Sequence, residues 1–317
     1  MLAMRWFVWC ITFVLVLAVS VLVETSIHRH DKKILHEQFE EDIEKCGGKL
    51  KEVRCVVEGA DGWLFLQESL INIVADWHPN TEQIIAFNDS LEERGIELVV
   101  VPVPDKLQAE ADHYIDIPNY EITARNYDDW IETLQKNDVT VINALDKFRE
   151  LRNYTPMFEP NESHCTGAAR QVLAEMVADS IEDLFEDNPK KQYLLKDTLV
   201  PGTGNLYRLL HKKYSNYKVE EAKVITPDGK KYRGSKKAPI VVIGDSNAGQ
   251  GSNISSNIGA YIAQSIGEET YTISKVGGGN IGPTLFKNRD EFLHGKRAVV
   301  WVFDGRELYG EFEKPAF

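Results

Sequence analysis

Two short stretches of this chain carry the side-chain types of a nucleophilic site. Gly-Asp-Ser at 244–246 ends a run of β-branched residues, and Glu162 and His164 lie two positions apart in a loop that contains two prolines. A serine, a histidine and an acid brought together define nucleophilic acyl transfer. Such a site requires that the fold bring Ser246, His164 and Glu162 to one place.

Ser246 follows residues 240–243, which lack polar alternation and are predicted to form a strand buried on both faces. Its hydroxyl would then lie at the C-terminal end of a central strand, where open α/β sheets place their sites. The backbone N–H groups of the next helix would point at the same spot and could form an oxyanion hole. The alternative is that Ser246 only caps that helix.

Glu162 and His164 lie in the loop 154–167, which precedes a predicted helix at 168–185. In an extended segment, a spacing of two sends both side chains to the same side, where the carboxylate could orient the imidazole. The alternative is a solvent-facing glutamate and a histidine at a helix entry.

Two further strand ends carry polar groups. The predicted strand 270–276 runs into three glycines and Asn280, so Gly278 and Asn280 could bind an oxyanion or substrate, although a flexible turn is the alternative. Arg306 follows the predicted strand 298–303 and could bind a sugar or a carboxylate. Pairing of Arg306 with Asp304 or Glu307 is the favoured alternative.

Apolar strands alternate with helices along the chain, which predicts an α/β fold with a parallel sheet and helices on both faces. The remaining predicted elements are strands at 63–66, 96–103 and 139–142, and helices at 81–94, 123–136, 284–293 and the second half of 247–266. In such a fold, one rim of the sheet could collect all four polar segments.

The uncharged apolar run 6–23 predicts one N-terminal transmembrane helix, followed by a charged juxtamembrane helix at 31–45. We expect residues 1–33 to form the membrane anchor and residues 34–317 the domain. A polar excursion at about 188–236 is expected to contain a hairpin around the turn 227–230. The basic residues that flank the span would by themselves place the domain in the cytoplasm. The site chemistry and a cysteine pair favour the other side.

The composition of the chain limits the classes of ligand and partner that it can bind. The net charge of −13 argues against nucleic acid, whose phosphates require a basic surface. Cys46 and Cys55 could close a small disulfide loop in an oxidising compartment or remain two free thiols. The cysteines and histidines lack zinc-site spacing, so no structural metal is predicted.

At these residues the chain resembles a known family. Gly244-Asp245-Ser246 is similar to the first block of SGNH hydrolases, and the order of acid and histidine before serine resembles the AlgX/AlgJ-like alginate O-acetyltransferases. The stretches 61–66 and 101–106 also resemble that family. Glu162 stands where the family has aspartate, and Cys165 where it has an aromatic residue.

The resemblance implies a three-layer SGNH-like fold and a serine acyl-enzyme, with Ser246 acylated, His164 as general base and Glu162 orienting it. It implies a membrane-anchored O-acetyltransferase at the inner membrane that acts in the periplasm on an exported or cell-surface polysaccharide. A membrane-bound acyl-donor protein is the expected partner, and no cofactor is expected. The alternatives are an acetyl esterase and a non-catalytic sugar-binding or assembly subunit.

Overall fold

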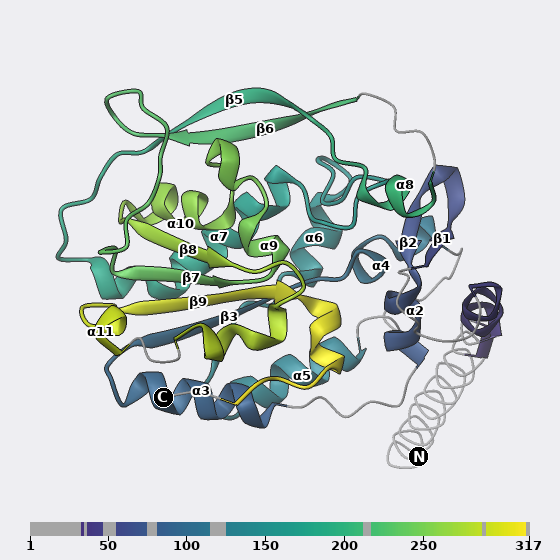
Figure 1. Ribbon diagram of the computed structural model, residues 1–317, viewed down its shortest axis with the longest axis horizontal. Coiled ribbons are helices and arrows are strands. Elements are labelled where there is room, and N and C mark those ends of the chain that lie inside the picture. The colour runs from purple at the N-terminus through teal and green to yellow at the C-terminus, as the bar shows by residue number, and fades with distance from the viewer. Residues whose placement is uncertain are drawn as a thin grey trace, which may run out of the picture.

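A five-stranded parallel sheet forms the centre of the computed structural model, in the order β4-β3-β9-β7-β8 (Figure 1). The structure describes residues 33–34, 37–46, 55–74, 81–114, 125–211, 217–286 and 290–314. The strands are β3 (Glu97–Val103), β4 (Thr140–Val141), β7 (Ile240–Gly244), β8 (Thr270–Ser274) and β9 (Ala298–Asp304). The three central strands β3, β9 and β7 are almost entirely buried, as their β-branched runs predict.

Helices cover both faces of this sheet, which confirms the predicted α/β class (Figure 1). On one face lie α7 (Gly167–Ile181) and α10 (Ile258–Ile266), and Gly259 of α10 fits closely against Thr272 of β8. On the other face lie α3 (Glu82–Glu92) and α5 (Arg125–Gln135). There Phe87 of α3 meets the Trp301 ring edge to face, with ring centroids 5.6 Å apart.

The predicted helix at 284–293 is wrong in its first half. A 3₁₀ segment, η6 (Gly279–Phe286), passes over the sheet instead. Among the residues of the predicted helix that the structure describes, those of α11 (Asp290–Leu293) are α-helical. The indole N–H of Trp301 donates to the Gly279 carbonyl at 2.9 Å, and a Cβ at Gly282 would collide with the same indole. Close approach to this tryptophan therefore shapes the segment. The predicted helix at 168–185 likewise ends as η4 (Glu182–Phe185).

The polar excursion forms a long antiparallel ribbon on the side of the sheet that carries α7 and α10 (Figure 1). Strand β5 (Leu194–Pro201) pairs with β6 (Lys218–Ile225), and the short helix α8 (Asn205–Leu209) lies between them in sequence. The turn predicted at 227–230 follows this ribbon, where a single bridge joins Ile225 to Lys231. The main hairpin is thus formed by strands that precede the predicted turn.

The N-terminal part of the domain is tied to the rest by packing and by a disulfide. Residues 37–45 are helical, and the fully buried Phe39 packs with Val57 and Phe65. Cys46 and Cys55 are joined by a disulfide. The predicted span at 6–23 lies outside the described residues, and no helix within the described ranges is long and apolar enough to cross a bilayer.

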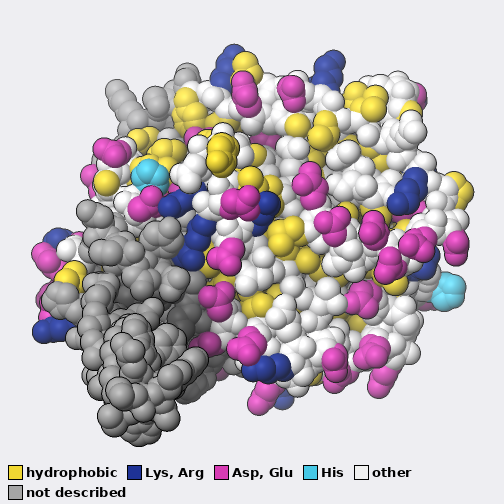
Figure 2. Space-filling view, turned by 180° about the vertical axis from the view of Figure 1, so that it is seen from behind, with side chains coloured by type: hydrophobic (Ala, Val, Ile, Leu, Met, Phe, Trp, Pro, Cys, Tyr) yellow, Lys and Arg dark blue, Asp and Glu magenta, His cyan; other side chains and the backbone are white. Residues whose placement is uncertain are grey.

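The remaining elements are short. They are β1 (Val56–Glu58), η1 (Ala60–Gly62), β2 (Leu64–Leu66), α2 (Gln67–Val74), α4 (Lys106–Ala109), η2 (Ala111–His113), α6 (Leu145–Leu151), α9 (Ser246–Gly249), η5 (Ser252–Ile254) and η7 (Gly305–Tyr309). Figure 2 shows the back of the molecule, where Asp and Glu side chains are scattered over the surface and Lys and Arg are fewer. This face fits the net charge of −13.

Candidate active site

Ser246 follows β7 directly and begins the short helix α9. Gly244 is required at the strand end, because a Cβ there would collide with the Val302 carbonyl of the neighbouring strand. Asp245 caps the helix: its carboxylate accepts the N–H of Asn247 at 2.7 Å. The alternative in which Ser246 caps α9 is therefore wrong. Its hydroxyl oxygen lies instead 2.9 Å from Nε2 of His164.

The histidine lies on a closed loop before α7. An antiparallel bridge between Phe158 and Cys165 closes this loop, and the Thr166 hydroxyl caps α7. Within it, Glu162 Oε1 lies 2.6 Å from Nδ1 of His164. An ionised carboxylate can only accept hydrogen bonds, so Nδ1 carries the proton and Nε2 is left to accept from the serine hydroxyl. This is the tautomer that a general base requires.

The second oxygen of Glu162 is held by residues that the sequence did not single out. Oε2 accepts hydrogen bonds from the Thr203 hydroxyl and from the backbone N–H of Asn205, the latter at 3.1 Å. The Asn205 side chain also accepts the N–H of Ser163 at 2.9 Å. Burial alone would raise the pKa of Glu162, but its bonds to His164, Thr203 and Asn205 lower it below the usual value.

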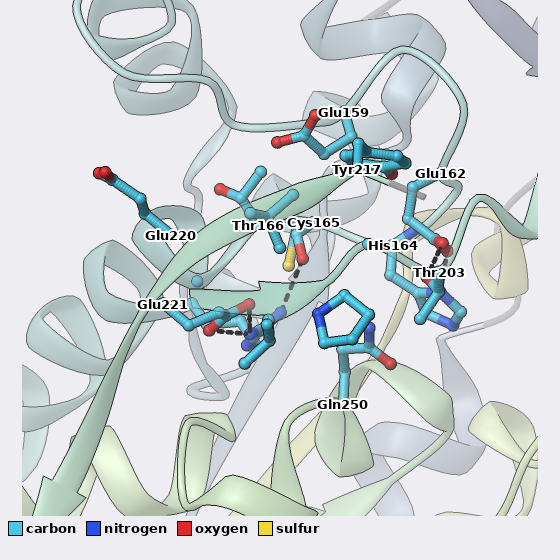
Figure 3. A pocket seen from close by; sticks show the side chains of 16 residues that line it. Glu159, Glu162, His164, Cys165, Thr166, Thr203, Tyr217, Glu220, Glu221 and Gln250 are labelled. Carbon is cyan, nitrogen blue, oxygen red and sulfur yellow. Dashed lines mark hydrogen bonds and ion pairs between the residues drawn. The ribbon is translucent and has the colours of Figure 1, made fainter. Parts of the chain in front are cut away.

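A pocket of about 70 Å³ opens beside His164, between the loop 154–167 and the β5–β6 ribbon (Figure 3). Its labelled carboxylates include Glu159, Glu220 and Glu221 (Figure 3). The guanidinium of Arg170 is committed to Glu221, whose two oxygens it contacts at 2.8 Å. The pocket is therefore an acidic recess next to His164.

Cys165 lines the same pocket but is only 3% exposed. Burial raises the pKa of its thiol to about 12. Only the thiolate is an effective nucleophile, so Cys165 is unreactive and only forms part of the pocket wall.

Two of the other predicted site residues are directed elsewhere. The N–H of Gly278 donates to the Lys275 carbonyl at 3.0 Å, so it closes a turn. The side-chain amide of Asn280 donates to the Glu311 carbonyl at 2.9 Å. Both residues thus donate to backbone carbonyls, and the turn is the better interpretation of the three glycines.

Arg306 has the structural role that the sequence favoured. Its guanidinium donates to Asp304 at 2.8 Å and lies 3.3 Å from Asp105. Asp304 in turn offers its backbone N–H to Asp245 at 2.9 Å. Arg306 therefore neutralises the buried acids at the ends of β3 and β9 and braces the turn that carries Ser246.

One group outside this site has metal-ligand geometry. Glu110, Asp112 and His113 place one ligand atom each within 4.8 Å of one another. Arg152 already contacts both carboxylates, Glu110 at 3.4 Å and Asp112 at 2.5 Å. The guanidinium thus supplies the positive charge that an ion would bring.

The sequence of this chain is similar to those of proteins of alginate biosynthesis. A family model described as the SGNH hydrolase-like domain of the acetyltransferase AlgX matches residues 56–304. The alginate biosynthesis protein AlgX of Pseudomonas aeruginosa is 23% identical over 284 aligned positions, which cover 78% of this chain and 55% of the relative. The probable alginate O-acetylase AlgJ of Pseudomonas fluorescens is 21% identical over 272 positions, covering 80% and 68%. The chain therefore spans about half the length of AlgX.

Two solved structures share the fold. The O-acetyltransferase domain of Pseudomonas putida AlgJ superposes with a TM-score of 0.66 at 16% identity, covering 83% of this chain and 95% of that one. Pseudomonas aeruginosa AlgX also gives a TM-score of 0.66, at 20% identity, covering 81% of this chain and 64% of the other.

Proposed function

The chain belongs to the family of SGNH hydrolase-like domains typified by the acetyltransferase AlgX, and we propose that it transfers acetyl groups to hydroxyls of an exported or cell-surface polysaccharide. The observation that carries the proposal is the continuous hydrogen-bonded chain from Glu162 through His164 to Ser246. A non-catalytic subunit has no need of a carboxylate aligned on the imidazole that meets the serine.

The reaction follows from this chain in two steps. Ser246 Oγ attacks the acetyl carbonyl carbon of the donor, and its proton passes to Nε2 of His164, which then protonates the departing donor group. A sugar hydroxyl attacks the resulting serine ester, again losing its proton to Nε2. Ser246 Oγ leaves with that proton, so the free enzyme and an O-acetylated sugar result.

Negative charge develops on the acetyl oxygen in both steps and requires donors near Oγ. The N–H groups of the first turn of a helix have no partners within that helix. In α9 the Asn247 N–H is already bound by Asp245. We therefore assign the oxyanion role to the backbone N–H of Ser246, in place of Gly278 and Asn280.

Two further features support the location that we propose for the domain. The apolar run 6–23 would anchor the chain in the inner membrane as a single span. The disulfide between Cys46 and Cys55 is typical of an oxidising compartment. Together they favour a periplasmic or extracytoplasmic domain that receives its acetyl groups from a membrane-bound acyl-donor protein.

Acetyl transfer can be tested with the purified full-length chain and its Ser246→Ala variant. Each is incubated with 4-nitrophenyl acetate, with and without sugar oligomers, and the sugar products are weighed by mass spectrometry. We expect acetylated sugar from the wild type alone. Ester consumption that depends on Ser246 but leaves every sugar unmodified would favour an esterase, and equal behaviour of two folded proteins would favour a binding subunit.

A further inference from the structure

A buried lysine contacts the loop that carries Glu162 and His164. Lys106 is the first residue of α4 and is only 5% exposed. Its ammonium nitrogen lies 4.8 Å from the centroid of the Trp63 ring and 5.3 Å from that of Phe65. Lysine is almost never buried unless its charge is paired and hydrogen-bonded, so the partners of this ammonium indicate its role.

Those partners are three backbone carbonyls of the loop 154–167, which carries Glu162 and His164 and is called the catalytic loop from here on. Lys106 Nζ donates to the carbonyls of Glu159 and Pro160 at 2.8 Å and to that of Glu162 at 3.2 Å. An ammonium has three N–H donors, so all three are used. The remaining carbonyl of this stretch, that of Asn161, accepts the N–H of Leu206 at 3.1 Å. Every carbonyl from 159 to 162 is therefore fixed.

We infer that Lys106 is a positioning residue of the acyl-transfer site, whose ammonium fixes the backbone of residues 159–162 so that Glu162 and His164 stay aligned with Ser246. The inference rests on the proposed function. Thr203 and Asn205 hold the carboxylate of Glu162 from the ribbon side, whereas Lys106 holds its backbone. Hydrogen bonds from a charged donor are roughly twice as strong as neutral ones, which suits this role.

The same turn also supports the serine. Asp105, next to Lys106, pairs with Arg306 at 3.3 Å, and Arg306 binds Asp304 at the end of β9. The Asp304 N–H donates to Asp245, the residue before the nucleophile. Two adjacent residues of the β3–α4 turn thus support both halves of the site. Lys106 contacts the histidine loop directly, whereas Asp105 is connected to the serine turn through Arg306 and Asp304.

The charge of Lys106 offers a readout that a merely structural role would not change. Burial lowers the pKa of Lys106 to about 7, opposed by the carboxylates of Glu110, Glu162, Asp105 and Glu159. His113 stacks on the Trp63 ring, and burial and, to a smaller extent, the charge of Lys106 lower the pKa of that imidazole. A neutral amine has two N–H donors and cannot hold three carbonyls. We therefore expect kcat to fall as pH rises above about 7.

The test compares Lys106→Met with a matched variant, Lys296→Met, in the full-length chain. Lys296 is also buried, donates to the carbonyls of Lys236 and Ala238 at 2.6 and 2.7 Å, and lies 4.7 Å from the Phe292 ring centroid. It lies at the opposite end of the sheet, before β9 begins. Both variants lose a buried ammonium, but only Lys106 contacts the catalytic loop.

With 4-nitrophenyl acetate as substrate, Lys106→Met is expected to lower kcat about 100-fold at nearly unchanged KM, the loss that follows from a displacement of about 1 Å at the reacting groups. Lys296→Met is expected to lower the melting temperature and leave kcat within about twofold of the wild type. A folded Lys106→Met protein with wild-type kcat would overturn the inference, as would equal kcat losses in both variants.

A second variant keeps the test decisive if Lys106→Met does not fold. Lys106→Arg retains a positive charge that does not titrate in this range. Its kcat should be lower than that of the wild type and should not decline above about pH 7. The same alkaline decline in Lys106→Arg as in the wild type would contradict the inference. Activity that survives Ser246→Ala would show instead that the proposed function itself is wrong.

Discussion

Oε1 of Glu162 lies 2.6 Å from Nδ1 of His164, while Oε2 of the same carboxylate binds the backbone N–H of Asn205 at 3.1 Å. One side chain therefore joins the histidine to the loop that follows β5. Glutamate reaches both partners because it is one methylene longer than the aspartate found in the resembling family.

This arrangement predicts an order of activity for substitutions of Glu162. Glu162→Gln removes the charge and presents an N–H₂ group to donors, so kcat should fall roughly 10²–10⁴-fold, as expected when the histidine loses its orienting anion. Glu162→Asp keeps the charge but cannot reach both partners, so its loss should be smaller. Steady-state ester hydrolysis measures both variants. Wild-type kcat in Glu162→Gln would show that the carboxylate does not act on His164.

Thr203 should influence activity through Glu162. In Thr203→Val, Oε2 loses the hydroxyl donor while burial remains, so the pKa of Glu162 should rise toward or above its ordinary value. The ionised form would then be lost at higher pH, and the acid limb of the kcat/KM profile should move upward. A charged hydrogen bond of about 1.5–3 kcal/mol implies a loss of roughly tenfold or more.

Thr203→Ser is the matched control for this experiment, because serine retains the hydroxyl. It should restore most of the activity and the position of the acid limb. An unchanged pH profile in Thr203→Val would mean that the hydroxyl does not stabilise the ionised carboxylate.

The burial of Glu110 predicts that the free energy of unfolding depends on pH. It is 2% exposed, and burial raises its pKa to about 7, opposed by Arg152. A carboxyl whose folded-state pKa is raised stabilises the fold below its ordinary pKa of 4.5, and that stabilisation is lost as pH rises through about 7. Glu110→Gln escapes this loss, so its free energy of unfolding relative to the wild type should improve between pH 5 and pH 8, by on the order of 2–3 kcal/mol.

Denaturant unfolding at several pH values measures this difference. Glu132→Gln is a suitable control, because Glu132 is an exposed glutamate on α5 whose side chain is 62% accessible. A Glu110→Gln difference that is the same at pH 5 and pH 8 would rule out ionisation of this buried carboxyl as a source of instability.

The sheet and the meeting of Ser246, His164 and Glu162 were predictable because their signals are local. Continuous β-branched runs specify strands buried on both faces, and these runs gave the three central strands at nearly their observed bounds. Glu162 and His164 are two residues apart, and their side chains meet as predicted, although the backbone there forms a turn and a bend rather than the expected extended segment. The place of Ser246 at the C-terminal end of a strand could be predicted from the apolar run that precedes it.

The supporting contacts were not predictable from the sequence, because they join distant segments. Thr203 meets a carboxylate 41 positions earlier, and no periodicity in the polar excursion marks that contact. Lys106 belongs to a residue type that is normally exposed, so its burial depends on aromatic rings and carbonyls from two other segments. The glycines before Asn280 led to the opposite error. Their conformational freedom suggested a ligand-binding loop, whereas Gly278 closes a turn in the structure.

The central claim is that Ser246 carries the acetyl group, and peptide mapping of the trapped intermediate tests it most directly. The full-length chain is mixed with 4-nitrophenyl acetate, quenched in acid within the first turnover, digested and analysed by mass spectrometry. We expect an acetyl group on the peptide that contains Ser246. It should be absent from Ser246→Ala and lost when an acceptor sugar is added before the quench. An acetyl group found only on other residues, or retained in Ser246→Ala at the wild-type level, would contradict it.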